Sequence, residues 1–383
     1  MRVFLIAGEP SGDALGAALM AGLKQLVPGV RFDGVGGPAM QSEGLTGRFP
    51  MEELSVMGLA EVLPKYRALK RRIAQMADLI CATSPDVVVT IDSPDFCLRV
   101  AQKVKATGAN IRIVHYVAPS VWAWRPKRAD KMAARVDQVL ALLPFEPPYM
   151  EAAGVACDFV GHPVATMQVA TKAEIAVFRE RFSLGDAPLL LALPGSRRGE
   201  VQRLTARFGA ALAAFCATHP HMRIVLPCAA PVAGLVRELT ANWAVQPVLI
   251  DPAEDRDGAM KRAAFAAADL ALAASGTVSL ELAANDVPMV IAYDMSPLSR
   301  MIISRMVTID TVTLVNLVSD TRVVPEYIGK NCTPEGIAEG LENVWAAPEA
   351  QKDAIRLTME RLGQGGEPPG LRAARAVLRG LSG

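Results

Sequence analysis

The sequence lacks the patterns by which several common classes of protein are recognised. Its six cysteines stand in apolar contexts without a Cys-x-x-Cys pair, which favours reduced thiols of a cytoplasmic protein over a disulfide framework. The four histidines form no recognisable zinc-binding set. The chain has no Gly-x-Gly-x-x-Gly fingerprint and no P-loop Gly-Lys-Ser/Thr, so a dinucleotide-dependent dehydrogenase is disfavoured.

Net charge and long apolar runs are also scarce. The net charge at pH 7 is +1, which gives no global field for binding nucleic acid. Charged residues interrupt the longest apolar stretches before they reach the roughly 18 residues of a membrane span. The start, Met1-Arg2-Val3-Phe4-Leu5-Ile6, is typical of a first strand and too short for a signal peptide. With 51% hydrophobic residues over 383 positions, we expect a folded protein of two domains.

The apolar pattern predicts two successive series of buried strands and helices. The strands expected in the first series are Arg2–Ala7, Arg31–Val35, Asp86–Ile91, Ile111–Val117, Val139–Leu143 and Phe159–Val160, with helices over Gly12–Val27 and Phe96–Ala106. Those expected in the second are Pro188–Leu193, Met222–Leu226, Pro247–Ile250, Asp269–Ala273 and Pro288–Ala292, with helices over Val201–Thr218, Val232–Trp243, Pro334–Leu362 and Leu371–Leu381. Continuous apolar strands separated by helices indicate parallel sheets covered on both faces. The prediction is an α/β protein with two Rossmann-like domains facing a central cleft, in a strand order that the pattern does not give.

The junction between the domains is expected in Ala165–Phe182, which has few strand signals. We predict an N-terminal domain over residues 1–165, a second domain over 166–362, and a last helix within 363–383 that packs back on the N-terminal domain. In such sheets, ligands bind beyond the carboxyl ends of the strands. The loops that follow the predicted strands are therefore the candidate site.

Two turns of the second domain suit a diphosphate. Ser275-Gly276-Thr277 follows a strand and opens a helical pattern, where free N–H groups favour an anion. Ser196-Arg197 follows the first strand of the same domain, and the arginine can neutralise a leaving diphosphate. Glu281, one helical turn further on, can reach a ribose hydroxyl pair. The Ser275–Thr277 turn alone is equally well explained as an ordinary helix N-cap, and two diphosphate-suited turns in one domain are more specific than either.

Two loops of the first domain carry carboxylates. Gly8-Glu9-Pro10-Ser11-Gly12-Asp13 follows the first strand, where it can hold a phosphate or a sugar, or where Ser11 and Asp13 can simply cap a helix. Gly34-Val35-Gly36-Gly37 is a second such loop. Asp92-Ser93-Pro94-Asp95 follows the most apolar strand, and one of its carboxylates can act as a general base. We favour Asp95; the alternative is a helix cap. The spacing is not Asp-x-Asp, so it does not suggest a metal that coordinates a diphosphate.

Two further segments have unusual compositions. His115–Arg125 contains Trp122 and Trp124 and leads into several basic residues, which suits sugar stacking and phosphate binding or else a structural aromatic cluster. In Leu59–Ile73, apolar residues recur at helical spacing among five basic residues, and Pro64 predicts a kinked or broken helix. Such a segment can lie in an anionic membrane surface. From the pattern alone, a helix packed on its own domain is favoured.

The loops together resemble a known family, the lipid-A-disaccharide synthases, which are inverting glycosyltransferases of bacterial outer-membrane lipid synthesis. The motifs keep their order over nearly the whole chain. They are Ala7-Gly8-Glu9-Pro10-Ser11-Gly12-Asp13, Gly34-Val35-Gly36-Gly37-Pro38, Ile91-Asp92-Ser93-Pro94-Asp95-Phe96, Val117-Ala118-Pro119-Ser120-Val121-Trp122-Ala123-Trp124, Leu193-Pro194-Gly195-Ser196-Arg197, Ser275-Gly276-Thr277 with Glu281, Asn316-Leu317, and Val324-Pro325-Glu326. Pro10 is a departure, because the family usually has a small residue there, and it stiffens the first loop.

The resemblance implies a fold of the GT-B kind and a reaction. The enzyme would transfer 2,3-diacylglucosamine from UDP to the 6-hydroxyl of 2,3-diacylglucosamine 1-phosphate, releasing UDP and giving the β(1→6) disaccharide precursor of lipid A. It would need neither metal nor cofactor. It would work at the cytoplasmic face of the inner membrane as a peripheral protein, with a homodimer as a family-level expectation.

The resemblance also implies roles for particular residues. The catalytic residues would be Asp95, as the base, and Arg197. The UDP-sugar would meet Ser196, Arg197, Ser275, Gly276, Thr277, Glu281 and Asn316. The acceptor would meet Glu9, Ser11, Gly12, Asp13, Trp122 and Arg125. With acylated substrates in view, membrane docking becomes the favoured role of Leu59–Ile73, through Leu63, Tyr66, Leu69, Arg71 and Ile73.

Two other functions stay open on the sequence. A different UDP-sugar enzyme, such as the peptidoglycan glycosyltransferase MurG or a UDP-N-acetylglucosamine epimerase, would share the diphosphate turns without needing the basic amphipathic segment. A non-catalytic nucleotide- or lipid-binding module would bind UDP and would be indifferent to loss of Asp95.

Overall fold

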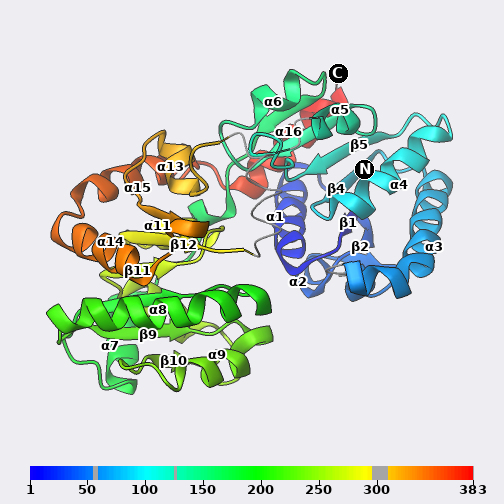
Figure 1. Cartoon of the computed structure of the whole chain (residues 1–383). Coiled ribbons are helices and arrows are strands. Elements are labelled where there is room, and N and C mark those ends of the chain that lie inside the picture. The colour runs from blue at the N-terminus through cyan, green and yellow to red at the C-terminus, as the bar shows by residue number, and fades with distance from the viewer. Residues whose placement is uncertain (55–58, 125–126, 296–308, 383) are drawn as a thin grey trace. The chain divides into compact units, whose positions relative to one another are not determined.

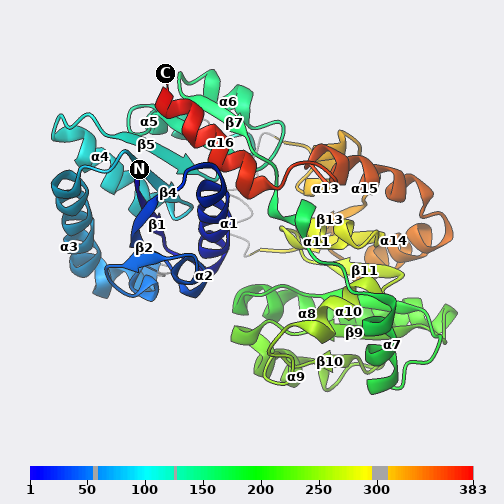
Figure 2. The same cartoon turned by 180° about the vertical axis from the view of Figure 1, so that it is seen from behind.

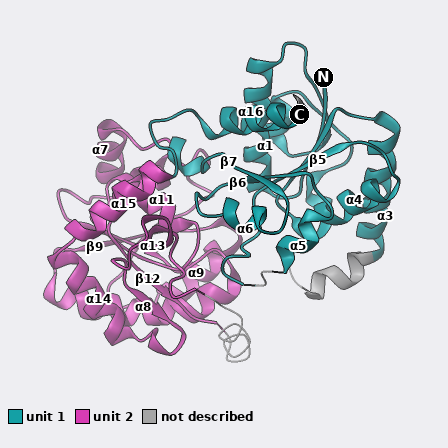
Figure 3. Cartoon of the chain, turned by 90° about the horizontal axis from the view of Figure 1, so that it is seen from above, with its two compact units in different colours: residues 1–166, 362–383 teal, residues 167–361 magenta. Residues whose placement is uncertain are grey.

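The structure is a computed structural model that describes residues 1–54, 59–124, 127–295 and 309–382. The chain forms two compact units (Figure 3). Unit 1 comprises Met1–Thr166 and Leu362–Gly383, and unit 2 comprises Met167–Arg361. Both are α/β, so the predicted fold class is confirmed for each unit taken by itself.

Unit 1 is built on a parallel sheet that has seven strands in the described part of the chain. Across the sheet they are β3 (Leu45–Gly47), β2 (Arg31–Val35), β1 (Arg2–Ala7), β4 (Val87–Ile91), β5 (Arg112–Tyr116), β6 (Gln138–Ala141) and β7 (Ala156–Phe159). The order reverses between β1 and β4, which pair in register up to Ala7 and Ile91. This is the topological switch point of the sheet.

Helices cover both faces of this sheet. They are α1 (Pro10–Leu26), α2 (Pro38–Ser42), α3 (Leu59–Thr83), α4 (Pro94–Ala106), α5 (Arg128–Ala133), α6 (Pro147–Glu151) and α16 (Pro369–Ser382). The C-terminal helix α16 packs along α1 on one face, and α3 packs on α4 on the other (Figures 1 and 2). The end of the chain thus completes the core of the unit that begins it, with Ala373 and Val377 fully buried.

Unit 2 repeats the architecture. Among its described residues the parallel strands lie in the order β10 (Val248–Ile250), β9 (Arg223–Pro227), β8 (Leu189–Leu193), β11 (Leu270–Ala273), β12 (Met289–Tyr293) and β13 (Glu326–Ile328). The helices are α7 (Lys172–Arg181), α8 (Arg198–Thr218), α9 (Ala233–Thr240), α10 (Ala259–Ala266), α11 (Val278–Ala284), α13 (Leu314–Ser319), α14 (Pro334–Ala346) and α15 (Glu349–Arg361). One core lies between the sheet and α8, α9 and α14. The switch point falls between β8 and β11.

Two predicted elements need correction. The single helix expected over Pro334–Leu362 is two helices, α14 and α15, separated at Ala347 and Pro348, because a proline cannot continue a helix. Of the kinked or broken helix expected at Pro64, the break is absent, since α3 is one helix. Pro64 is the sixth residue of α3, so the helix continues past a position that has no N–H donor. In the described part of the chain, no helix is both long and apolar enough to cross a membrane.

Candidate active site

The switch point of unit 1 brings two predicted loops together. The loop after β1 begins at Gly8 and the loop after β4 begins at Asp92, and their strands are paired neighbours. A Cβ atom added to Gly8 would lie 2.7 Å from the Ser93 hydroxyl, so the two loops are in direct contact. Glu9 and Asp95 therefore both lie at the carboxyl ends of neighbouring strands in the same sheet.

The loop after β4 has an unusual backbone. Asp92 and Ser93 both have positive φ, 51° and 43°, which is costly for residues other than glycine. This turn places Asp95 in the first turn of α4, exposed to solvent. Strain of this kind is characteristic of functional loops, and an exposed carboxylate at this edge is what a general base requires.

Asp13 is buried and holds a neighbouring loop. Its carboxylate accepts hydrogen bonds from the backbone N–H groups of Gly37 (2.8 Å), Ala39 (2.9 Å) and Met40 (3.0 Å). It therefore caps α2, and not its own helix as the capping alternative supposed. Asp13 thus joins the first two glycine-rich loops and holds them in position relative to each other.

The rest of the first loop is divided between packing and exposure. Pro10 occupies the first position of α1, where proline's fixed φ is favourable and no N–H is required. Glu9 is half-buried and Ser11 is exposed, whereas Gly12 is buried against Ala7 and Ile91. Glu9 and Ser11 are thus polar side chains of this loop that remain accessible.

The aromatic segment after β5 is held by a buried acid that sequence reasoning missed. Trp122 Nε1 donates to Glu146 Oε1 (3.3 Å), and the N–H groups of Leu142 and Leu143 donate to Oε2. Trp122 also packs edge-to-face on Phe145, with ring centroids 5.1 Å apart. Burial raises the pKa of Glu146 to about 7. Its two backbone donors lie only three and four residues before it, but its contact with Trp122 joins two loops that are distant in the sequence, and no local pattern marks that contact. Arg125, predicted to bind the acceptor, lies outside the described residues.

The switch point of unit 2 brings the two diphosphate-suited turns together. Leu193 at the end of β8 pairs with Ala273 at the end of β11, and the Ala274 N–H donates to the Leu193 carbonyl at 2.8 Å. The turns that follow are accessible: Ser196, Arg197, Gly276 and Thr277 are exposed and Ser275 is half-buried. Two small-residue turns and an arginine at one strand-end crevice suit a nucleotide diphosphate.

Glu200 and Tyr293 lie behind Arg197 and were also missed. Glu200 accepts from the Arg197 N–H (3.3 Å) and from Arg197 Nη1 (2.9 Å), and the Tyr293 hydroxyl donates to it at 3.3 Å. Glu200 lies three residues after Arg197, as the glutamate of a capping box does, but arginine has no acceptor to complete the box, so the pattern alone does not mark Glu200.

Two predicted nucleotide contacts have other partners in this structure. Glu281 pairs with Lys261 of α10 at 3.0 Å and is partly exposed. Asn316 is 1% exposed and uses both ends of its amide on the Val324 backbone, with a further bond to Thr311 Oγ1. Asn316 thereby fixes the segment that leads to β13. The structure does not bring Glu281 or Asn316 to the Arg197 turn through any hydrogen bond described for them.

The described residues contain no cluster of three or more His, Cys, Asp or Glu suited to a metal ion. An Asp-x-Asp does occur at Asp255-Arg256-Asp257, between β10 and α10. Asp255 accepts from the N–H groups of Met260 and Lys261, and Asp257 accepts from that of Ala259. These carboxylates cap α10 locally.

The predicted membrane residues of α3 divide into three groups. Ile73 is 7% exposed and belongs to the core of unit 1, and Leu69 packs against that core. Arg71 is exposed. The side chains of Leu63 and Tyr66 lie outside the described part of the chain. Two of the five residues therefore pack within the unit, and membrane docking stays a prediction.

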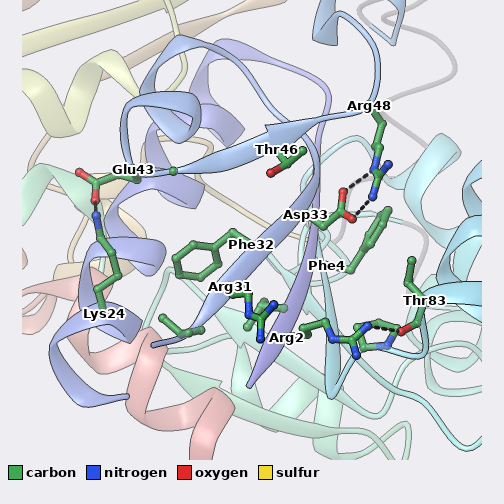
Figure 4. A pocket seen from close by; sticks show the side chains of 14 residues that line it. Arg2, Phe4, Lys24, Arg31, Phe32, Asp33, Glu43, Thr46, Arg48 and Thr83 are labelled. Carbon is green, nitrogen blue, oxygen red and sulfur yellow. Dashed lines mark hydrogen bonds and ion pairs between the residues drawn. The ribbon is translucent and has the colours of Figure 1, made fainter. Parts of the chain in front are cut away.

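A pocket of about 420 Å³ opens on unit 1 beside β1 and β2, away from the switch point. Figure 4 shows its charged walls, where Lys24 pairs with Glu43 and Arg48 pairs with Asp33. Arg2 donates to the Thr83 carbonyl at 3.0 Å. No residue predicted for the active site lines this pocket.

Two Rossmann-like units, each with candidate residues at the switch point of its parallel sheet, define the GT-B architecture of nucleotide-sugar enzymes. Solved structures share it: UDP-GlcNAc 2-epimerase from Neisseria meningitidis bound to UDP-GlcNAc is 12% identical, with a TM-score of 0.64 and 100% of both chains covered. A glycosyltransferase from Rickettsia africae is also 12% identical, with a TM-score of 0.60, covering 100% of this chain and 98% of that one. At such identities the likeness shows the fold alone.

Sequence comparison narrows the class to a family. The model of the lipid-A-disaccharide synthetase family matches residues 3–366. The lipid-A-disaccharide synthase of Ruegeria pomeroyi is 67% identical over 100% of this chain and 96% of its own length, and that of Rhodospirillum centenum is 46% identical over 99% and 94%. The chain belongs to the lipid-A-disaccharide synthase family, the glycosyltransferases of lipid A biosynthesis, as the resemblance of its motifs predicted.

Proposed function

We propose that the chain condenses UDP-2,3-diacylglucosamine with 2,3-diacylglucosamine 1-phosphate, giving the β(1→6) disaccharide 1-phosphate and UDP. The observation that carries the proposal is that the turns containing Arg197 and Ser275–Thr277 follow two paired strands at one switch point, in a chain of this family. These groups suit the diphosphate of the donor. The substrates are those that the resemblance implies.

The proposed chemistry is a single inverting displacement without a metal. Asp95 takes the proton of the acceptor 6-hydroxyl as the hydroxyl oxygen attacks the anomeric carbon, while UDP leaves from the opposite face. Negative charge grows on the departing diphosphate, and the Arg197 guanidinium with the Ser275–Thr277 turn stabilises it. Asp95 is favoured over Asp92 because it is exposed, whereas Asp92 is half-buried.

The remaining predicted residues take proposed parts that follow from their surroundings. Glu9, Ser11 and Trp122 belong to the acceptor side. Asp13 acts there through the loop that it caps. On the donor side, Glu281 must break its ion pair with Lys261 before it can bind the ribose. Asn316 acts indirectly, by fixing the backbone at Val324. The protein is proposed to work as a peripheral protein at the cytoplasmic face of the inner membrane and to form a homodimer, which sedimentation of the full chain tests.

The experiment measures UDP release by the purified full chain from UDP-2,3-diacylglucosamine in detergent micelles, with and without 2,3-diacylglucosamine 1-phosphate. We expect release that depends on the acceptor, with a disaccharide forming in step. Asp95→Asn should reduce kcat by at least about a hundredfold, the scale of a lost general base, and leave UDP affinity unchanged. Asp78→Asn, at an exposed aspartate of α3 in the same unit, is the matched control.

Several outcomes would contradict the proposal. Release without the acceptor would indicate another UDP-sugar reaction. If no UDP is released either with or without the acceptor, UDP-N-acetylglucosamine is the next donor to test. Wild-type turnover in Asp95→Asn would remove Asp95 from the mechanism.

A further inference from the structure

The turn at the start of α8 contains a buried carboxylate to which the proposed mechanism gives no part. The Glu200 side chain is 8% exposed, whereas the Arg197 side chain that it contacts is 70% exposed. A carboxylate at such depth requires compensating donors, because taking its charge out of water is costly. Its donors are therefore informative about what it does.

Those donors come from the turn itself and from a neighbouring strand. One carboxylate binds both the main chain and the guanidinium of Arg197, at 3.3 Å and 2.9 Å. Tyr293, at the end of β12, donates its hydroxyl at 3.3 Å. Burial, reinforced by the Glu200 charge, raises the pKa of Tyr293, so the phenol keeps its proton as a donor. Glu200 thus ties Arg197 to the rigid sheet.

The shape of the turn depends on the same side chain. Gly195 has φ +111°, which glycine adopts without strain. A Cβ atom at Gly195 would lie 2.6 Å from Glu200 Oε2 and 2.8 Å from Glu200 Cβ. The backbone before Arg197 therefore closes directly on Glu200, and the two can keep this arrangement only together.

We propose that Glu200 is a positioning residue, which holds the Arg197 guanidinium and the Gly195–Arg197 turn in the geometry that receives the donor diphosphate, with Tyr293 holding Glu200. The inference rests on the proposed function of Arg197. An arginine side chain has many rotamers, and restraining them on folding removes that entropy loss from the binding step.

The negative charge of Glu200 makes the inference sharply testable. If positioning is its main effect, neutralising it weakens diphosphate binding. If its charge mainly opposes the field of Arg197, neutralising it strengthens binding. Glu200→Gln keeps the size of the side chain and separates these two signs.

The experiment measures UDP binding by calorimetry, and the KM of donor and acceptor separately, on the full chain. For Glu200→Gln we expect the Kd of UDP and the donor KM to rise about tenfold, the scale of one charge-assisted hydrogen bond, with the acceptor KM unchanged. In the Arg197→Ala background the same substitution should have no further effect, since Glu200 acts through Arg197. Tyr293→Phe should shift the donor KM in the same direction by a smaller factor.

The matched control is Glu174→Gln. Glu174 closes a capping box with Thr171 at the start of α7 in the same unit, so it shares the local chemistry of Glu200 without an arginine. Its donor KM should equal that of the wild type.

Unchanged or tighter UDP binding by Glu200→Gln would overturn the inference, and so would a further tenfold loss in the Arg197→Ala background. If Glu200→Gln does not fold, Tyr293→Phe decides: a raised donor KM supports the inference and an unchanged one overturns it. Unchanged UDP binding by Arg197→Ala would instead overturn the proposed donor site itself.

Discussion

At the scale of single residues, buried polar groups hold exposed ones in place. Asp13, Glu146 and Glu200 are each buried, and each accepts at least one hydrogen bond from a backbone N–H group of a loop at a strand end. The groups proposed to meet substrate, Asp95 and Arg197, are exposed. Buried acids rigidify the loops, because an unpaired buried acceptor or donor would be costly.

His115 gives a pH-dependent prediction at the same scale. It is 1% exposed in β5 and contacts Thr90 Oγ1 through Nδ1 at 2.8 Å. Burial lowers its pKa to about 4. In the unfolded chain the pKa of this histidine is about 6.5. The contribution of neutral His115 to the free energy of unfolding is therefore complete above pH 6.5. It is lost as the pH falls from 6.5 to 4 and changes no further below 4. The loss is about 3 kcal/mol.

The measurement compares wild type with His115→Gln in urea unfolding of the full chain at several pH values. His162 and Glu146 also titrate in this range, but they are present in both proteins and cancel in the difference. The wild type should lose about 3 kcal/mol relative to the variant between pH 7 and pH 4. Parallel curves for the two proteins would mean that folding does not lower the pKa of His115.

At the scale of elements, the contact between α1 and α16 joins the two ends of the chain in unit 1. It is close because glycines lie in it. A Cβ atom at Gly22 would lie 2.7 Å from the Gly370 carbonyl oxygen, and one at Gly370 would lie 2.4 Å from the Ala18 carbonyl oxygen. These obstacles are backbone atoms, so a larger residue must displace a helix.

Gly370→Ala should therefore destabilise the chain by about 1–3 kcal/mol, the usual cost of overpacking, and should increase hydrogen exchange in α16. Gly234→Ala is the matched control. Each glycine is the second residue of its helix, but a Cβ at Gly234 would meet nothing within 4 Å. Gly234→Ala should stabilise α9 by up to about 1 kcal/mol through helix propensity. Equal effects of the two substitutions would refute the close packing of α1 and α16.

Most elements could be predicted from the sequence because their apolar period is strong. The strands Arg2–Ala7 and Arg31–Val35 have the predicted bounds, and in the first a continuous apolar run follows a charged residue. The short edge strands β3 and β13 were missed because three residues carry no period. Strand order was out of reach, as pairing depends on contacts between distant residues.

The candidate site could be predicted only where it follows from position along a strand. Asp95 and Arg197 follow apolar strands, and the carboxyl end of a parallel strand is where ligands bind. Glu146 and Tyr293 could not be predicted, because each is defined by a partner from another element. The sequence marks Asp13 as a charged loop residue, but its contact with α2 depends on the folded structure and could not be predicted.

At the scale of the whole molecule, basic residues cluster on α3 although the net charge of the chain is close to zero. The net charge is +1, yet Arg67, Lys70 and Arg71 are all exposed on α3. Arg72 beside them is already engaged, paired with Glu53 at 2.7 Å and lying 4.3 Å from the centre of the Phe49 ring. Because Ile73 and Leu69 pack on the core, the cations of α3 are a better candidate than those two apolar residues for contact with an anionic bilayer.

Replacing Arg67, Lys70 and Arg71 together with Gln should therefore weaken binding to vesicles containing phosphatidylglycerol. Each basic residue near such a surface contributes about 1 kcal/mol, so the loss should be roughly a hundredfold at low salt and should shrink as salt screens the wild type. The control replaces Lys172, Arg223 and Lys330, three exposed cations of unit 2, with Gln and makes the same change in net charge. Co-sedimentation with vesicles measures both. Equal losses would mean that overall charge governs binding, and no loss in either would leave α3 as a helix with a solvated basic face.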